Sequence, residues 1–233
     1  MNRRTAVILG AGHGVGRETA LAMAQAGMNV VAVCDNNATP SKAPARLPRE
    51  FAEATLACDF LDEPAVAQAM QLAADRHGGI DILVTAVGGA TPCPFDQLSL
   101  ADWETQLHTG LTTVFLACKH AVGHMRSGGL IVNVASMAAK EPYPNWSAYV
   151  AARHGLLGFS ATIREELRGR GIAVTVIAPG ATDGLLEFGQ PDEWDTTRML
   201  CSWQVADIIV HTARVAPHAV VEEIHVRHPA GRL

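Results

Sequence analysis

The sequence has few aromatic residues and no long apolar run. Aromatic residues make up 5% of the 233 residues, whereas apolar residues of all kinds make up 48%. Small and aliphatic side chains therefore dominate, as expected where helices cover both faces of a parallel sheet. No stretch approaches the roughly 20 apolar residues that span a membrane. We expect a single domain over residues 1–233 and no membrane partner.

The sequence also has no C-x-x-C pair, and its five cysteines are scattered. This distribution indicates reduced thiols, not a disulfide framework or a zinc site, and predicts a cytoplasmic protein. The net charge of −5 gives no electrostatic reason to expect nucleic acid or an anionic membrane as a partner. His120 and His124 are spaced to share one helix face, but no third ligand joins them, so no metal is predicted.

Segments of strand length alternate with helical periods along the whole chain. Strands are expected at Thr5–Leu9, Asn29–Cys34, Thr55–Cys58, Ile80–Ala86, Leu130–Val134, Ala173–Ile177 and Val220–Val226. Helices are expected at Gly14–Ala26, Pro64–His77, Ser99–Arg126, Ser147–Arg170 and Gln204–Ala213. Such alternation requires right-handed crossovers between parallel strands. The predicted fold class is therefore α/β, a single-domain Rossmann-type doubly wound fold. Its seven-stranded sheet is mostly parallel, with helices on both faces.

Two local signals refine this pattern. Ser99, with Asp102 three residues later, resembles a capping box that opens the third helix. Pro40, Pro44 and Pro48 interrupt the segment between the second and third strands. Because prolines at this spacing do not permit a full crossover helix, we expect a loop or a short helix starting near Pro48.

A cluster of glycines directly follows the first expected strand, in the run Gly10-Ala11-Gly12-His13-Gly14-Val15-Gly16. Glycine lets the backbone turn tightly and approach a pyrophosphate, which the N-terminus of the next helix attracts. A tight strand-to-helix turn is the plainer interpretation, but the place of the cluster in the α/β pattern favours dinucleotide binding. The candidate cofactor contacts here are Gly10, Gly12, His13, Gly14, Val15 and Gly16.

The glycine spacing is G-x3-G-x-G, which resembles the short-chain dehydrogenase/reductase family. Further matches follow in register over essentially the whole chain. Asp59 resembles the acidic residue that holds the adenine, 129–136 resembles the fifth strand with its terminal serine, and Pro179-Gly180 follows the sixth strand. The resemblance implies cofactor contacts at Asp59, Gly88, Pro179, Gly180 and Thr182. It also implies an NAD(P)(H)-dependent oxidoreductase that interconverts a hydroxyl and a carbonyl group of a small organic substrate by hydride transfer.

Asp35, near the end of the second expected strand, bears on the choice of cofactor. An acidic side chain at this place accepts hydrogen bonds from the ribose 2′-OH and repels a 2′-phosphate. His13 replaces the basic residue that NADP-dependent members of the family often carry. NAD(H) is therefore favoured, and NADP(H) stays possible. A turn role before Asn36 is the alternative for Asp35.

Three residues form the expected catalytic group. Tyr149 and Arg153 are four residues apart in a helical segment and so share one face. Ser136 ends a strand at the sheet edge where doubly wound folds bind ligands. By resemblance, Tyr149 would be the acid/base, Ser136 would hydrogen-bond the substrate oxygen, and Arg153 would supply a cation and bind the nicotinamide ribose. A phenol is a poor base at neutral pH, and a fixed cation close by favours the phenolate form.

Three departures from the family pattern accompany these matches. The family has lysine where this chain has Arg153, and an asparagine that holds a relay water where this chain has Gly110. Arginine keeps the charge but does not release a proton at accessible pH, so both replacements affect one proton relay. The third departure is Thr85-Ala86-Val87-Gly88 in place of Asn-Asn-Ala-Gly. From it we expect the polar side chains that tie this strand to its neighbours to be missing.

Two other functions stay open beside the oxidoreductase. One is a dinucleotide-binding sensor or scaffold without redox turnover, and the other is a dehydratase or isomerase that keeps Tyr149 as proton donor. Substrate contacts are expected from Gly89–Pro94, Tyr143–Trp146 and a substrate loop around 182–200. The helices over Ser99–Arg126 and Ser147–Arg170 resemble those through which family members pair, so a homodimer or homotetramer is expected.

Overall fold

The computed structural model describes residues 3–36, 55–184, 195–215 and 219–231. Within these ranges the strands are β1 (Thr5–Leu9), β2 (Asn29–Asp35), β3 (Thr55–Cys58), β4 (Ile80–Thr85), β5 (Met125–Val134), β6 (Ala173–Pro179) and β7 (Glu223–Val226). The α-helices are α1 (Gly14–Gln25), α2 (Glu63–His77), α3 (Leu100–Leu107), α4 (Thr113–Val122), α5 (Ser147–Arg168) and α6 (Ser202–Arg214). A π-helical turn over His108–Thr112 joins α3 to α4.

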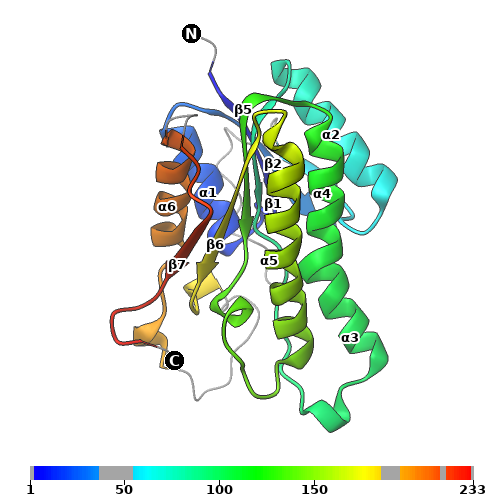
Figure 1. Cartoon of the computed structure of the whole chain (residues 1–233), viewed down its shortest axis with the longest axis vertical. Coiled ribbons are helices and arrows are strands. Elements are labelled where there is room, and N and C mark those ends of the chain that lie inside the picture. Colours follow the sequence, from blue (N-terminus) through cyan, green and yellow to red (C-terminus); the bar gives the residue numbers. More distant parts are fainter. Residues whose placement is uncertain (1–2, 37–54, 185–194, 216–218, 232–233) are drawn as a thin grey trace.

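The strands form one sheet in the order β3-β2-β1-β4-β5-β6-β7, and every neighbouring pair is parallel. The chain therefore builds outward from β1 in one direction to β3, and then from β4 in the other direction to β7 (Figure 1). The connection after β1 leads to β2 on one side of β1, and the connection after β4 leads to β5 on the other side of β4. A reversal of this kind opens a crevice at the carboxyl edge of the sheet, where doubly wound folds bind ligands. The predicted Rossmann-type α/β fold is confirmed.

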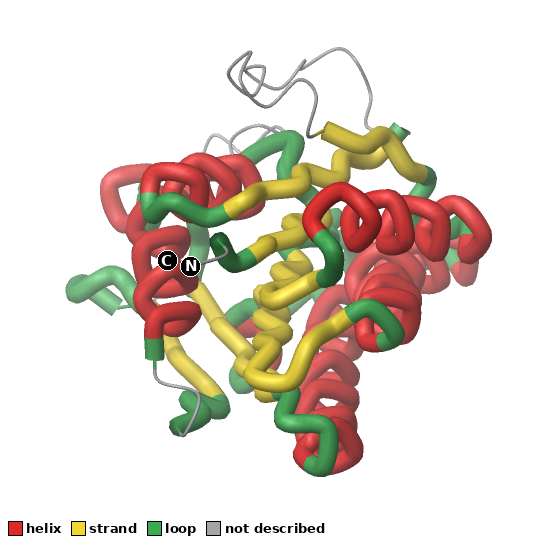
Figure 2. Tube along the Cα trace, turned by 90° about the horizontal axis from the view of Figure 1, so that it is seen from above, coloured by secondary structure: helices red, strands yellow, loops and turns green. Residues whose placement is uncertain are grey.

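Helices cover both faces of the sheet (Figure 2). Helices α1 and α6 pack together on one face, and α2, α4 and α5 cover the other. Alternate residues of β1 supply the two cores, because successive side chains of a strand point to opposite faces. Ala6 and Ile8 belong to the α1–α6 side, and Val7 and Leu9 belong to the other. All four side chains are fully buried, so the strand that leads into the glycine turn is fixed from both sides.

Element boundaries differ most from the sequence prediction in two places. The predicted helix Ser99–Arg126 is wrong at its end, because α4 stops at Val122 and Met125 already pairs with Ile80 in the sheet. Strand β7 begins at Glu223, three residues later than predicted. The segment near Pro48 lies outside the described residues. The cap at Ser99 is confirmed, since its Oγ accepts a 3.1 Å hydrogen bond from the Asp102 N–H.

A buried polar chain ties β4 to β5 and α5, which corrects the expectation that such ties are missing. Thr85 Oγ1 donates to Asn133 Oδ1 over 2.8 Å, and Asn133 Nδ2 donates to Ser160 Oγ over 2.9 Å. All three residues are fully buried, so each hydrogen bond is shielded from water and costly to break. The sequence prediction overlooked that threonine can replace the family's asparagine as a donor. These hydrogen bonds hold the end of β5, which leads to Ser136, against α5, the helix that carries Tyr149.

Candidate active site

The carboxyl edge of the sheet encloses a cavity of about 490 Å³. Residues that line it come from the glycine turn, from the ends of β4, β5 and β6, from the start of α5 and from the segment after β7. The predicted site residues that line it are His13, Gly14, Val15, Gly88, Ser136, Tyr149, Arg153, Pro179, Gly180 and Thr182. The structure thus brings most of the predicted cofactor contacts and all three predicted catalytic residues to one place.

Gly10 and Gly16 shape the glycine turn without lining the cavity. A Cβ on Gly10 would lie 2.2 Å from the Ala86 carbonyl oxygen, and a Cβ on Gly16 would lie 2.1 Å from the Gly10 carbonyl oxygen. The turn therefore packs against the residue that follows β4 and against its own backbone, so closely that neither Gly10 nor Gly16 has room for a Cβ atom. This close packing brings the N-terminus of α1, with Gly14 and Val15, to the cavity wall, and the resulting cradle fits the pyrophosphate of a dinucleotide.

The close approach at Gly16 predicts a large effect of one added methyl group. We expect Gly16→Ala to lower the free energy of unfolding by about 3 kcal/mol, roughly 6–12 °C in Tm, because backbone must move to admit the Cβ. Gly158→Ala is the matched control, since it also adds a Cβ to a helical glycine but meets no atom within 4 Å. The control should leave Tm unchanged or raise it slightly. Thermal unfolding measures both, and equal Tm values would contradict the close contact.

Asp35 and Asp59 lie at the carboxyl ends of the neighbouring strands β2 and β3, and neither lines the cavity. Asp35 is exposed at the end of β2 and pairs in register with Cys58. Asp59 Oδ1 accepts a 2.9 Å hydrogen bond from the Leu61 N–H. Burial raises the pKa of the Cys58 thiol to about 11, and the charges of Asp59, Asp35 and Asp62 contribute. Three carboxylates therefore lie near Cys58, at the carboxyl ends of β2 and β3.

Ser136 and Tyr149 face the cavity from β5 and α5. Ser136 follows the end of β5, where its Oγ accepts a 3.1 Å hydrogen bond from the Ala138 N–H. The Tyr149 ring packs edge-on against Trp146, with 5.5 Å between centroids. Both side chains are only half-buried, so a substrate in the cavity can reach their hydroxyl groups.

Arg153 is 2% exposed and holds its guanidinium against backbone carbonyls. Nη2 donates to Val87 O over 2.9 Å and to Gly88 O over 3.1 Å, and Nη1 donates to Val134 O over 3.4 Å. Its Cζ atom lies 4.9 Å from the centroid of the Tyr149 ring, a cation–π arrangement. These hydrogen bonds go to neutral carbonyl oxygens and hold the guanidinium in place, and within the described ranges Arg153 forms no ion pair with a carboxylate.

Arg153 and Gly110, at which the sequence predicts departures from the family pattern, meet at Gly88. A Cβ on Gly88 would lie 2.6 Å from Arg153 Nη2 and 3.1 Å from the Cα of Gly110. Gly110 is buried within the π-helical turn, which brings it to this point from between α3 and α4. Arg153 and Gly110 are therefore neighbours in the structure. The guanidinium is fixed between the ends of β4 and β5, next to a position that has no side chain.

The sequence prediction missed the contribution of the segment after β7. Arg227, His228 and Gly231 line the cavity together with Arg198. Strand β7 pairs in parallel with β6, with Val226 opposite Pro179, so the residues after Val226 lie at the same edge as Gly180. No local motif marks these residues, because they reach the cavity through the pairing of β7 with β6. Residues 185–194 of the predicted substrate loop lie outside the described residues.

The parallel sheet, the glycine turn and the cavity at its carboxyl edge define a Rossmann-type dinucleotide-binding protein. The profile of the short chain dehydrogenase family matches residues 4–188. The chain is 37% identical over 203 residues to a D-threitol dehydrogenase of Mycolicibacterium smegmatis, which covers 85% of this chain and 76% of the relative. It is 33% identical over 234 residues to a cis-4-hydroxycyclohexanecarboxylate dehydrogenase of Sinomonas cyclohexanicum, which covers 95% of this chain and 93% of the relative.

A solved structure of a blue fluorescent protein from a metagenomic library, in complex with NADPH, has the same fold. Its TM-score is 0.84 at 21% identity, and the match covers 97% of each chain. The chain belongs to the short-chain dehydrogenase/reductase family. It is an oxidoreductase that uses NAD(P)(H) to interconvert a hydroxyl and a carbonyl group, and the sensor and dehydratase alternatives are not favoured. Among the described residues, no helix is long and apolar enough to cross a membrane.

Proposed function

We propose that the protein is an NAD(H)-dependent dehydrogenase/reductase that uses Tyr149 as acid/base, Ser136 to hold the substrate oxygen and Arg153 as a fixed positive charge. One observation carries this proposal: the three side chains and the glycine turn line a single cavity. A substrate that contacts the hydroxyl groups of Ser136 and Tyr149 therefore shares the space of the nucleotide that the turn would hold.

The proposed chemistry assigns one task to each of the three residues. The bound nicotinamide ring donates or accepts the hydride. Ser136 Oγ already accepts from the Ala138 N–H, so its own O–H is the group that donates to the substrate oxygen. Tyr149 gives a proton to that oxygen during reduction and takes it back during oxidation. Arg153 stabilises negative charge on the phenol oxygen, but it passes no proton because arginine does not ionise at accessible pH.

The preference for NAD(H) over NADP(H) is supported by the carboxylates at the end of β2 and β3. Asp35, Asp59 and Asp62 all lie close enough to Cys58 to raise the pKa of its thiol. A 2′-phosphate at this edge would meet like charges, whereas a 2′-OH can donate to the Asp35 carboxylate.

We expect Asp35→Ala to weaken NADH binding about tenfold, the loss of one hydrogen bond to a charged group, and to strengthen NADPH binding. Fluorescence titration with each reduced cofactor measures both affinities. Asp75→Ala is the control, because Asp75 is an exposed residue of α2 whose side chain bonds Gln71. An unchanged ratio of the two affinities would show that another residue selects the cofactor.

The substrate is proposed to be a small alcohol or ketone, as the names of the polyol and ring-acid relatives suggest. We propose that the protein is cytoplasmic and works as a homodimer or homotetramer through α4 and α5. Phe115 on α4 remains 42% exposed although its ring packs edge-on against Phe159 of α5, which supports this face as the contact. Light scattering of the purified protein measures the assembly.

The function is tested by fluorescence titration with both reduced cofactors, followed by a substrate screen with the preferred one. We expect tight NADH binding and a change in cofactor absorbance with some members of an alcohol and ketone panel. Tight binding without turnover across the whole panel would contradict the proposed oxidoreductase chemistry, and no binding of either cofactor would contradict the proposed site.

A further inference from the structure

Residues 227–231, which we call the wall segment, follow β7 and form part of the cavity wall. Arg227, His228 and Gly231 of this segment line the cavity. The segment folds back on itself, because the Ala230 N–H donates to His228 Nδ1 over 3.2 Å and the Gly231 N–H donates to His228 O over 2.9 Å. The wall segment is therefore a compact turn, and its position depends on how it is attached to the rest of the protein.

Two contacts hold the wall segment, one near each end. At its start, both terminal nitrogens of Arg227 donate to the two carboxylate oxygens of Glu141, a fork-to-fork pair. Toward its end, Arg198 Nη2 donates to Ala230 O over 2.9 Å. Glu141 belongs to the loop between β5 and α5, and Arg198 belongs to the segment before α6. The wall segment is therefore fastened between two other parts of the chain.

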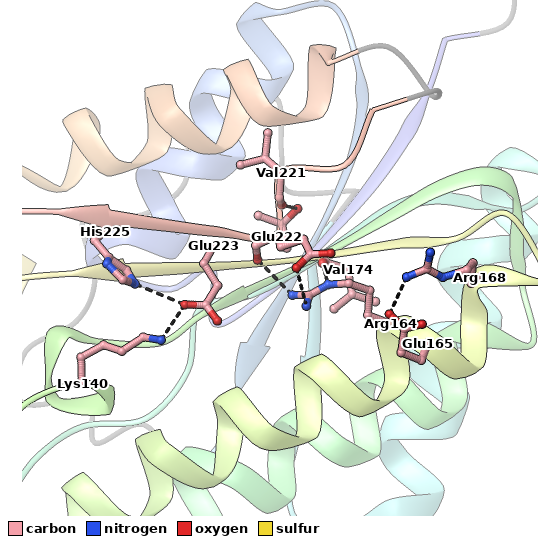
Figure 3. Close-up of polar contacts among 10 residues, drawn as sticks. Lys140, Arg164, Glu165, Arg168, Val174, Val221, Glu222, Glu223 and His225 are labelled. Carbon is pink, nitrogen blue, oxygen red and sulfur yellow. Dashed lines mark hydrogen bonds and ion pairs between the residues drawn. The ribbon is translucent and has the colours of Figure 1, made fainter.

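A second ion pair lies beside the pair of Glu141 and Arg227. Lys140 Nζ is 2.7 Å from Glu223 Oε2 of β7 (Figure 3), so two consecutive loop residues contact the strand and the residue that follows it. A basic and then an acidic residue of the loop face an acidic and then a basic residue of the later chain. A shift that paired Lys140 with Arg227 would bring like charges together, so the charge order specifies one arrangement.

Strand β7 itself is fastened at the edge of the sheet. Figure 3 shows Arg164 of α5 at the β6–β7 edge, where it donates to Val174 O over 2.8 Å and to Glu222 O over 3.0 Å. Thr175 Oγ1 adds a 2.7 Å hydrogen bond to Val221 O. These contacts fix a strand of only four residues, so the chain enters the wall segment from a defined place.

Glu141 holds the wall segment without lining the cavity. Among the described residues that line the cavity, Arg227 is present and Glu141 is not. An effect of Glu141 on a bound, uncharged substrate would therefore act through the position of the wall segment. The same cavity holds Ser136 and Tyr149, so the position of the wall segment bears on how far a substrate can extend from these two hydroxyl groups.

We propose that the wall segment limits the length of the substrate, and that Glu141 is the positioning residue that holds this segment in place. The inference rests on the proposed function, because the length is counted from Ser136 and Tyr149, where the substrate oxygen would bind. It narrows the substrate class to short alcohols and ketones. A longer substrate that reaches the wall segment must displace it and break its contacts with Glu141 and Arg198, a cost that a short substrate does not meet.

Hydrogen exchange tests whether Glu141 holds the wall segment. We expect Glu141→Ala to speed amide exchange in residues 227–231 by up to about fivefold, the effect of losing one partly exposed ion pair. Glu141→Gln should give an intermediate rate, because its amide oxygen still accepts a hydrogen bond from Arg227. Glu165→Ala is the matched control, since it removes an exposed carboxylate of α5 that pairs with Arg168. Unchanged exchange in Glu141→Ala would overturn the proposal.

Substrate selectivity tests whether the wall segment limits length. A homologous series of uncharged secondary alcohols, each one methylene longer than the last, is assayed at saturating oxidised cofactor. Glu141→Ala should raise the ratio of kcat/KM between the longest and the shortest alcohol by up to about fivefold, with cofactor affinity unchanged. Glu165→Ala should leave this ratio unchanged. A gain for long alcohols distinguishes a displaced wall from a destabilised protein, which would lose activity toward every alcohol. Faster exchange with an unchanged ratio would refute the proposal.

Salt provides the same test without a substitution, and so decides the matter if Glu141→Ala does not fold. High ionic strength screens exposed ion pairs, so the ratio should rise in the parent protein and rise less in Glu141→Ala. A ratio in the parent protein that does not respond to salt would count against the proposal. If no alcohol turns over with either cofactor, the proposed function has failed. Affinities of the alcohols for the enzyme–cofactor complex, measured by calorimetry, then replace kcat/KM in the same comparison.

Discussion

Tyr149→Phe is expected to reduce turnover by about 10²–10⁴-fold while NADH binding stays within a factor of about two. The substitution removes only the hydroxyl group, so the ring can still pack against Trp146 and under the Arg153 guanidinium. What is lost is the proton donor and acceptor at the substrate oxygen. Steady-state kinetics with the best substrate and a fluorescence titration with NADH measure the two quantities on the same preparation.

Tyr143→Phe is the matched control for this loss. Tyr143 lines the same cavity, and its ring lies 6.2 Å from Trp146, but it precedes α5 and is not one helical turn from Arg153. Its hydroxyl should therefore matter little for kcat. Comparable losses in the two variants would mean that the effect is not specific to the hydroxyl group one helical turn from Arg153. Retained turnover in Tyr149→Phe would exclude this tyrosine as the acid/base and point to a non-phenol donor.

The parallel α/β fold and the elements that carry the candidate site could be predicted from sequence because both depend on local patterns. Alternating apolar runs and helical periods lead to parallel crossovers, and the glycines after the first strand mark the crevice. Tyr149 and Arg153 lie one helical turn apart, so their shared face follows from the helix alone. Ser136 follows from the end of an apolar strand. Each of these inferences needed only neighbouring residues and one rule of topology.

What could not be predicted depends on contacts between distant segments. The early start of β5 at Met125 arises from pairing with Ile80, which no helical period reveals. The link from Thr85 to Asn133 joins residues 48 positions apart. Arg227 and His228 reach the cavity only because β7 pairs with β6 in a particular register. The sequence also identified Arg153 as a cation without indicating which atoms hold it, and those atoms belong to the ends of β4 and β5.

Arg153→Met is expected to lower the free energy of unfolding by about 3 kcal/mol, roughly 6–12 °C in Tm, and to reduce turnover at least about 100-fold. The carbonyls of Val87, Gly88 and Val134 lose their donor inside the protein, and Tyr149 loses the charge beside its ring. The loss of stability arises because buried carbonyl acceptors lose their hydrogen-bond partner, and the loss of turnover arises because the positive charge beside Tyr149 is missing.

Arg153→Lys separates these two effects, since it restores the charge without the guanidinium fork. A single ammonium group is too compact to span the carbonyls of β4 and the Val134 carbonyl in the way that two guanidinium nitrogens do. We therefore expect NADH binding and turnover within about tenfold of the parent protein, together with part of the loss in Tm. Calorimetric Tm, NADH affinity and single-turnover hydride transfer are measured for both variants. If the lysine variant were as inactive as the methionine variant, positive charge alone would not explain the arginine. The fork geometry that holds β4 to β5 would then be what positions Tyr149 for proton transfer.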